Sequence, residues 1–302
     1  MRVGRRTILA AGVGAIAGMA ISESAAASPA DGFALDFAPH QGSFASRGTV
    51  LEQIAYAAEQ GFRAWEDNEA ARRSVAEQEA MARALSQHGM TMGVFVASMP
   101  RWKEFQPVLG GDDDSARDAF LTDIRAAVDV AKRLNARWTT VVPGFLDPRL
   151  PVDIQQARII DVLRRAADIM APHGIVMVME PLNTRTNHPR VFLQTIAQGY
   201  ALAVAVNDPS VKILADLYHE QIQSGNLIPT LDQCWDEIAY LQFGDNPGRK
   251  EPGTGEINYA IICKWLKEKG FAGVIGMEHG NSAGGRAGED RLIAAYRAIN
   301  PI

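Results

Sequence analysis

Residues 174–188 read GIVMVMEPLNTRTNH, and this stretch decides the fold. The run Ile175–Met179 is apolar without a break, which is typical of a strand buried on both faces of a parallel sheet. Glu180 follows where the run ends. The same pattern recurs three times, at intervals of 36, 26 and 36 residues, where apolar runs end at Asp216, Gln242 and Glu278. Such intervals are typical of strands that alternate with helices.

Four earlier apolar runs extend the series towards the N-terminus: Phe33–Pro39, Phe62–Trp65, Met90–Val96 and Trp138–Val142. Each of the eight runs is followed by a segment with helical periodicity; the last four of these segments are Val191–Val206, Leu227–Trp235, Ile257–Lys269 and Glu289–Ile299. No linker interrupts the alternation. The chain therefore predicts an α/β protein with a single (β/α)8 barrel over residues 28–302, whose strands all end on one face that carries the active site.

The first 27 residues have the composition of an export signal. Arg5 and Arg6 precede the weakly apolar run Ile8–Ile21, and Ala25–Ala27 suits small-residue cleavage. The stretch Arg5–Leu9 resembles a twin-arginine signal, the route for proteins that fold before export. We expect a cleavable signal peptide over residues 1–27, a periplasmic location and no stable membrane anchor after cleavage. An ordinary secretion signal or a retained anchor is the alternative.

Composition limits the remaining classes. The chain is 47% hydrophobic and 22% charged, which is ordinary for a globular protein. Loss of residues 1–27 leaves 27 basic and 34 acidic residues, and no basic stripe with interleaved aromatics is present, so we expect no nucleic-acid partner. The two cysteines, Cys234 and Cys263, lie inside helical patterns and are expected to be buried thiols. A homo-oligomer is compatible with the sequence, which does not fix the oligomeric state.

The polar residues at the four later strand ends define the expected chemistry. Three carboxylates and one amide at one barrel face would form a site for a hard cation. Glu180 and Glu278 could face a small substrate from opposite sides, remove a proton from a carbon next to a carbonyl and return one to the adjacent carbon. A divalent ion would polarise that carbonyl and hold the developing enediolate.

Two further residues are candidates for substrate binding. His219, three residues after Asp216, could hold a substrate oxygen or bond a loop carbonyl. Arg249, in a turn rich in glycine and proline, could bind a substrate carboxylate through its planar fork or form a surface ion pair with Glu251. The long segment 99–111 is either an active-site lid or a surface loop pinned by its aromatic residues.

Four segments resemble the hydroxypyruvate isomerase family, within the xylose-isomerase-like sugar isomerases and epimerases. They are MEPLNTRTNHPRVFL (179–193), DLYHEQIQSGNLIPTL (216–231), QFGDNPGRKEPGTGEINY (242–259) and GVIGMEHG (273–280). The resemblance implies an intramolecular oxidoreductase that interconverts hydroxypyruvate and tartronate semialdehyde, an aldose–ketose type of isomerisation. It implies that Mg²⁺ or Mn²⁺ is bound by Glu180, Asp216, Gln242 and Glu278, and that the two glutamates donate and accept the proton.

The first half of the chain departs from this resemblance. Residues 64–73 read AWEDNEAARR, where the family has an aromatic- and proline-containing segment. An exported keto-sugar epimerase or lyase that uses the same enolisation is therefore an alternative. A sugar-binding barrel without catalysis is a third hypothesis, although binding alone does not require both Glu180 and Glu278. In every case the partner is a small hydroxy-carbonyl acid or sugar.

Overall fold

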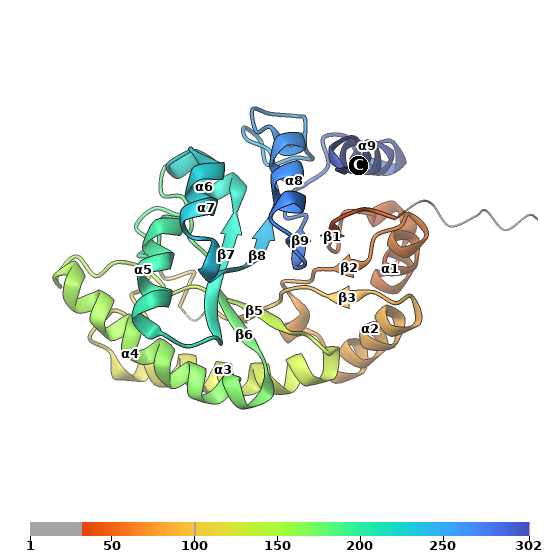
Figure 1. The fold of residues 1–302 in the computed structure, drawn as a ribbon. Helices are drawn as coiled ribbons and strands as arrows, with labels where there is room; N and C mark the ends of the chain where they lie inside the picture. Colours follow the sequence, from red (N-terminus) through yellow and green to blue (C-terminus); the bar gives the residue numbers. More distant parts are fainter. Residues whose placement is uncertain (1–31, 100, 302) are drawn as a thin grey trace, which may run out of the picture.

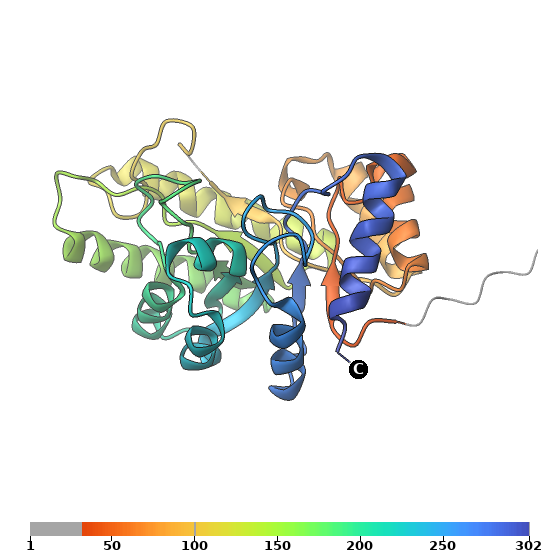
Figure 2. The same ribbon diagram turned by 90° about the horizontal axis from the view of Figure 1, so that it is seen from above.

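The computed structural model describes residues 32–99 and 101–301, so the expected signal peptide at 1–27 lies outside the described residues. Parallel strands form a curled sheet, and the long helices pack around its outside (Figures 1 and 2). This architecture confirms the predicted α/β barrel. Among the described residues, no helix is both long and apolar enough to cross a membrane.

Seven strands form one parallel sheet in the order β1-β9-β8-β7-β6-β5-β4, and β2 pairs with β3 in parallel. The strands span β1 Asp36–Ala38, β2 Ala64–Trp65, β3 Thr91–Met92, β4 Val96–Ser98, β5 Trp138–Val141, β6 Val176–Met179, β7 Val211–Asp216, β8 Ile238–Gln242 and β9 Val274–Gly276. Backbone bonds from Glu66 N to the Pro39 oxygen (2.9 Å) and from Val96 N to the Asn68 oxygen (3.3 Å) join the extension of β2 to β1 on one side and to β4 on the other. The strands therefore form a closed ring.

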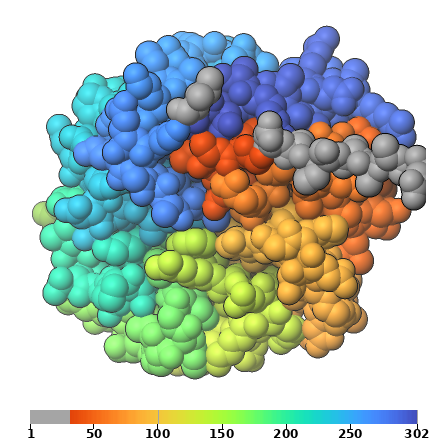
Figure 3. Space-filling model, turned by 45° about the vertical axis from the view of Figure 1, so that its right-hand side comes forward, coloured from red at the N-terminus to blue at the C-terminus, as the bar shows by residue number. Residues whose placement is uncertain are grey.

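The nine α-helices in the described residues span α1 Val50–Glu59, α2 Val75–Gln87, α3 Asp114–Leu134, α4 Val152–Met170, α5 Ile196–Val206, α6 Leu217–Gln223, α7 Leu227–Gln233, α8 Tyr259–Glu268 and α9 Gly285–Ile299. Six of them, α1, α2, α3, α5, α6 and α8, begin at a side-chain cap. Thr49 caps α1 in a reciprocal pair with Glu52. Figure 3 shows the red-to-orange N-terminal part beside the dark blue C-terminal part. Within the sheet, β1 pairs with β9.

Successive side chains of a strand point to opposite faces of the sheet, and this alternation places the polar strand-end residues above a small apolar interior. One side chain from each strand or its extension forms this interior: Ala38, Ala64, Val94, Trp138, Val178, Leu214, Tyr240 and Val274. Side chains two positions apart share a face. The residues two positions further along therefore point inward at the C-terminal end of the barrel, and they include Glu66, Glu180, Asp216 and Gln242.

Several element boundaries differ from the sequence prediction. The third strand is split into β3 and β4 at Gly93, where a Cβ would lie 2.4 Å from the Tyr240 hydroxyl that crosses the interior. The helix expected to start at Val191 begins at Ile196, because Val191 bridges to Phe145 and Thr195 forms the cap. The sixth unit holds two short helices, α6 and α7, instead of one.

Candidate active site

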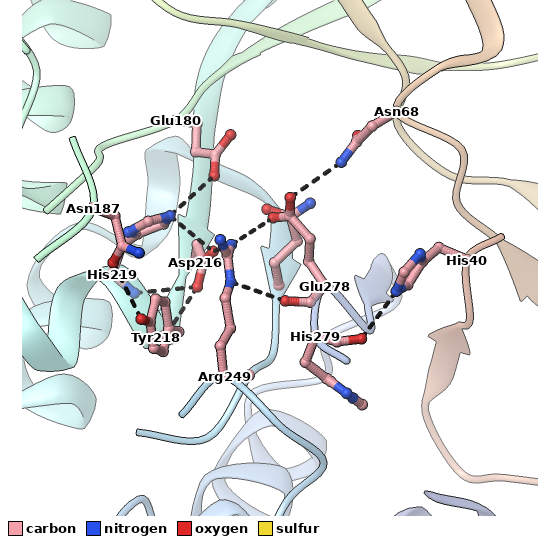
Figure 4. A network of polar contacts seen from close by, with 12 residues as sticks. His40, Asn68, Glu180, Asn187, Asp216, Tyr218, His219, Arg249, Glu278 and His279 are labelled. Carbon is pink, nitrogen blue, oxygen red and sulfur yellow. Dashed lines mark hydrogen bonds and ion pairs between the residues drawn. The ribbon is translucent and has the colours of Figure 1, made fainter. Parts of the chain in front are cut away.

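The four predicted strand-end residues lie at the carboxyl face of the barrel, and Figure 4 shows Glu180, Asp216 and Glu278 together there. Glu180 follows β6, Asp216 ends β7, Gln242 ends β8 and Glu278 lies two residues after β9. Glu180, Asp216 and Gln242 are buried, whereas the Glu278 side chain is 26% exposed. The site is therefore a buried acidic cluster with one carboxylate at its rim.

Arg249 occupies the centre of this cluster. Its Nη2 donates to Asp216 Oδ2 (2.8 Å) and to Glu278 Oε2 (3.0 Å), and its Nε donates to the Glu278 carbonyl oxygen (3.1 Å). The predicted alternative, an ion pair with Glu251, is wrong: Glu251 is buried and accepts bonds from Ser282. Arg249 is thus held by two carboxylates of the protein itself.

His219 is oriented by Asn183. Backbone N–H groups of Thr186 and Asn187 donate to Asn183 Oδ1 (3.0 and 3.2 Å), which turns the Asn183 Nδ2 towards His219 Nδ1 (2.6 Å). Because Nδ1 meets a donor, it accepts, and the proton lies on Nε2. That N–H faces Asp216 Oδ2 (3.6 Å) and Glu180 Oε1 (3.9 Å). The site therefore presents a hydrogen-bond donor between two carboxylates.

A buried carboxyl group lies beneath Gln242. Gln242 Nε2 donates to Glu66 Oε1 (2.9 Å), and the Tyr240 hydroxyl donates to Glu66 Oε2 (2.9 Å). This contact turns the Gln242 carbonyl oxygen away from Glu66, and that oxygen is buried without a hydrogen-bond partner. An unpaired buried oxygen is costly unless a ligand meets it.

Burial dominates the electrostatics. Desolvation raises the pKa of Glu180 well above its ordinary value of 4.5; the charges of Glu278 and Asp216 add to this, and Arg249 opposes it. Burial also raises the pKa of Asp216 and of Glu66. The pKa of His219 is lowered well below 6.5, first by burial and then by Arg249, so the imidazole is neutral at pH 7. The cluster consequently favours added positive charge.

The residues fit a divalent cation. Glu180, Asp216 and His219 offer ligand atoms within 4.8 Å of one another. The proton on His219 Nε2 makes that nitrogen a donor to an oxygen rather than a ligand. The unpaired oxygen of Gln242 is a suitable third donor beside Glu180 and Asp216, and Glu278 stands at the rim. Carboxylate and amide oxygens suit hard cations.

Residues 101–111 of the predicted long segment pack onto the loops beside the site. Trp102 contacts Phe145 and His188, with ring centroids 4.7 and 5.5 Å apart, and His188 in turn contacts His219 (5.3 Å). Phe105 packs on Phe145 as well (5.2 Å). The aromatic residues thus pin this segment, and Trp102 links it to the wall behind His219.

Sequence reasoning missed four residues that shape the site. Glu66 and Tyr240 lie inside the barrel, Asn183 orients His219, and Asn68 Nδ2 donates to Glu278 Oε1 (3.2 Å). The position of Glu66 directly after a short apolar run was the one available signal. The other three become visible only when distant loops meet.

The fold and site together define the class of protein. The chain belongs to the xylose isomerase-like TIM barrel family, whose family model matches residues 54–299. A putative hydroxypyruvate isomerase from Homo sapiens is 30% identical over 206 residues, or 67% of this chain and 74% of that protein. A 2-oxo-tetronate isomerase from Cupriavidus necator is 30% identical over 242 residues, or 79% and 90%. These matches confirm the resemblance stated from the sequence.

Solved structures agree. A structure described as AP endonuclease, family 2, from Brucella melitensis superimposes with a TM-score of 0.75 at 28% identity, covering 84% of this chain and 96% of that one. The 3-keto-D-glucoside 4-epimerase YcjR from E. coli superimposes with a TM-score of 0.73 at 20% identity, covering 87% and 99%. At 20% identity, the similarity to YcjR shows the shared fold alone.

Proposed function

We propose that this protein is an isomerase that moves a proton between adjacent carbons of a small hydroxy-carbonyl compound through an enediolate. The observation that carries the proposal is the pair Glu180 and Glu278. Both line one cavity, one carboxylate being buried and the other at the rim. The names of the relatives suggest hydroxypyruvate, which would be interconverted with tartronate semialdehyde, as a first substrate to test.

In the proposed isomerisation, each of these residues has a separate role. One glutamate removes the proton from the hydroxyl-bearing carbon, and the other delivers a proton to the former carbonyl carbon. The hydroxyl proton moves from one substrate oxygen to the other in the same conversion, so no atoms are gained or lost. His219 Nε2–H donates to an enediolate oxygen, and Arg249 balances the carboxylates. A raised pKa suits Glu180 to proton exchange near neutral pH.

A divalent ion, Mg²⁺ or Mn²⁺, belongs to this proposal. Glu180, Asp216, Gln242 and Glu278 would hold it, and it would supply Lewis-acid polarisation of the substrate carbonyl. The observation that supports ion binding is the unpaired Gln242 carbonyl oxygen, which the bond from Gln242 Nε2 to Glu66 holds in one direction. We further propose export to the periplasm by the signal at residues 1–27.

A second candidate is a keto-sugar epimerase or lyase that uses the same enolisation. The pairing of Arg249 with Asp216 and Glu278 favours it, because an arginine that already neutralises two carboxylates is a poor receptor for a substrate carboxylate. Both candidates share the proton-transfer step. Incubation with hydroxypyruvate and with keto-sugars in D₂O, followed by NMR, tests that step: deuterium should enter the carbon next to the carbonyl. No incorporation with any hydroxy-carbonyl compound would refute the proposed function.

A further inference from the structure

Arg249 contacts carboxylate oxygens that belong to the proposed ion site (Figure 4). Asp216 Oδ1 accepts from two backbone N–H groups at the start of α6 (2.8 and 3.3 Å), so Oδ2 is the oxygen left without a backbone bond. Arg249 Nη2 lies 2.8 Å from this Oδ2 and 3.0 Å from Glu278 Oε2. A positive charge of the protein therefore lies next to any ion that these carboxylates bind.

The loop that carries Arg249 holds this residue in place. Asp245 is buried, and its carboxylate oxygens accept four backbone N–H groups of loop 246–257 at 2.8–3.1 Å. The Arg249 N–H donates to the Asp245 carbonyl oxygen (2.8 Å), and the φ of Arg249 is 51°. A positive φ is uncommon outside glycine and persists where the surrounding structure imposes it. The guanidinium, which also lies 4.8 Å from the centre of the Tyr218 ring, is therefore a fixed part of the site.

The charges of the proposed ligands and of Arg249 match a divalent ion. Three ligands are carboxylates and the fourth, Gln242, is a neutral amide, so together the four bring three negative charges. Arg249 brings one positive charge, and three negative charges with one positive charge leave a net charge of −2. Loss of the guanidinium would leave −3, which matches a trivalent ion instead. Glu66, which bonds Gln242, is present in every variant compared below and does not affect the comparison.

We propose that Arg249 selects the charge of the bound ion, because its guanidinium weakens the binding of a trivalent ion such as Fe³⁺ more than that of Mg²⁺ or Mn²⁺. The inference rests on the ion site of the proposed function. Two cations that contact the same oxygen are about 5 Å apart, and their repulsion grows in proportion to the charge of the ion. Each unit of ion charge then changes the affinity about fourfold at the dielectric constant of water, and about two-hundredfold at an effective value of about 20.

Ca²⁺ and Tb³⁺ test the inference, because the two ions have nearly equal radii and differ by one charge. Calorimetry at one pH and one ionic strength gives the affinity of metal-free protein for each ion. In the neutral variants Arg249→Gln and Arg249→Met, the ratio of Tb³⁺ to Ca²⁺ affinity should rise by about tenfold. Arg249→Lys keeps the charge and loses the planar fork, so its ratio should stay within about threefold of the wild-type ratio. Protons released from the carboxylates affect both ions equally and cancel in the ratio.

Lys212→Met is the matched control. Lys212 lies at the opposite end of β7 from Asp216 and pairs with Glu237 (2.7 Å), and its side chain is 23% exposed, against 25% for Arg249. This variant should leave the ratio unchanged. A rise of less than about threefold in both neutral variants, or an equal rise in Lys212→Met, would overturn the inference and leave the proposed function standing.

Gln242→Ala identifies binding at this site, because it removes the unpaired oxygen and should weaken both ions. Wild-type protein that shows no such binding of either ion would refute the ion site of the proposed function, and the inference with it.

Discussion

Gly276 lies directly against the carboxyl group of Glu66. A Cβ atom added at Gly276 would stand 1.9 Å from Glu66 Oε2. The missing side chain on β9 thus makes room for a buried carboxyl group that comes from the loop edge of β2, on the far side of β1. Glu66 in turn bonds Gln242, so this glycine supports the site through two contacts.

Replacement of Gly276 by alanine should therefore destabilise the protein, by about 1–3 kcal/mol as for other overpacked interiors. Urea unfolding measures the change. Gly284→Ala is the control, because a Cβ there meets no atom within 4 Å and the backbone is extended. The double variant Gly276→Ala, Glu66→Ala should lose less stability than the sum of the two single variants. Strict additivity would show that the two residues do not clash.

Arg249 should set the acidic limb of the pH profile. A base acts as its carboxylate, so kcat/KM falls as the pH drops through the pKa of Glu180, which burial places above 4.5. Arg249 lowers this pKa, so Arg249→Gln should move the limb upward by about 1–3 pH units, whereas Arg249→Lys keeps the charge and should move it less. Profiles at constant ion concentration measure the shift. An unchanged limb in Arg249→Gln would be incompatible with this role.

Asn183 should determine which nitrogen of His219 carries the proton. Asn183→Asp keeps the acceptor for the two backbone N–H groups and turns a second acceptor towards Nδ1. The proton should then move to Nδ1, visible in ¹⁵N NMR, and kcat should fall at least about tenfold because the donor at Nε2 is lost. Asn187→Asp adds the same charge nearby without touching His219. Equal effects of both variants would point to charge rather than the tautomer.

The strand-end residues could be predicted because apolar runs recur along the sequence at intervals typical of strands that alternate with helices. In a parallel barrel every apolar run ends on the same face, so Glu180, Asp216, Gln242 and Glu278 follow from the chain alone. The bonds of Arg249 and the orientation of His219 could not, because they depend on contacts between separate loops. The break in the third strand depends likewise on Tyr240, which approaches Gly93 from the opposite wall.

The ion should be held through oxygen atoms and be removable. Chelation should abolish activity, and Mg²⁺ or Mn²⁺ should restore it. Gln242→His replaces an amide oxygen by an imidazole nitrogen, which suits Mn²⁺ better than Mg²⁺. Calorimetry should show the ratio of Mn²⁺ to Mg²⁺ affinity rise by about tenfold. Full activity after chelation, with metal-free protein verified by elemental analysis, would exclude an essential ion.

The central claim is that Glu180 and Glu278 act as the two proton-transfer groups, and solvent deuterium exchange in Glu180→Gln and Glu278→Gln tests it most directly. Each variant keeps the size of the side chain and removes the titrating group. We predict that each single variant loses at least about 10²-fold in exchange rate. The double variant should lose far less than the product of the two single losses, because the residues act as a unit. Wild-type exchange in either folded single variant would contradict the account.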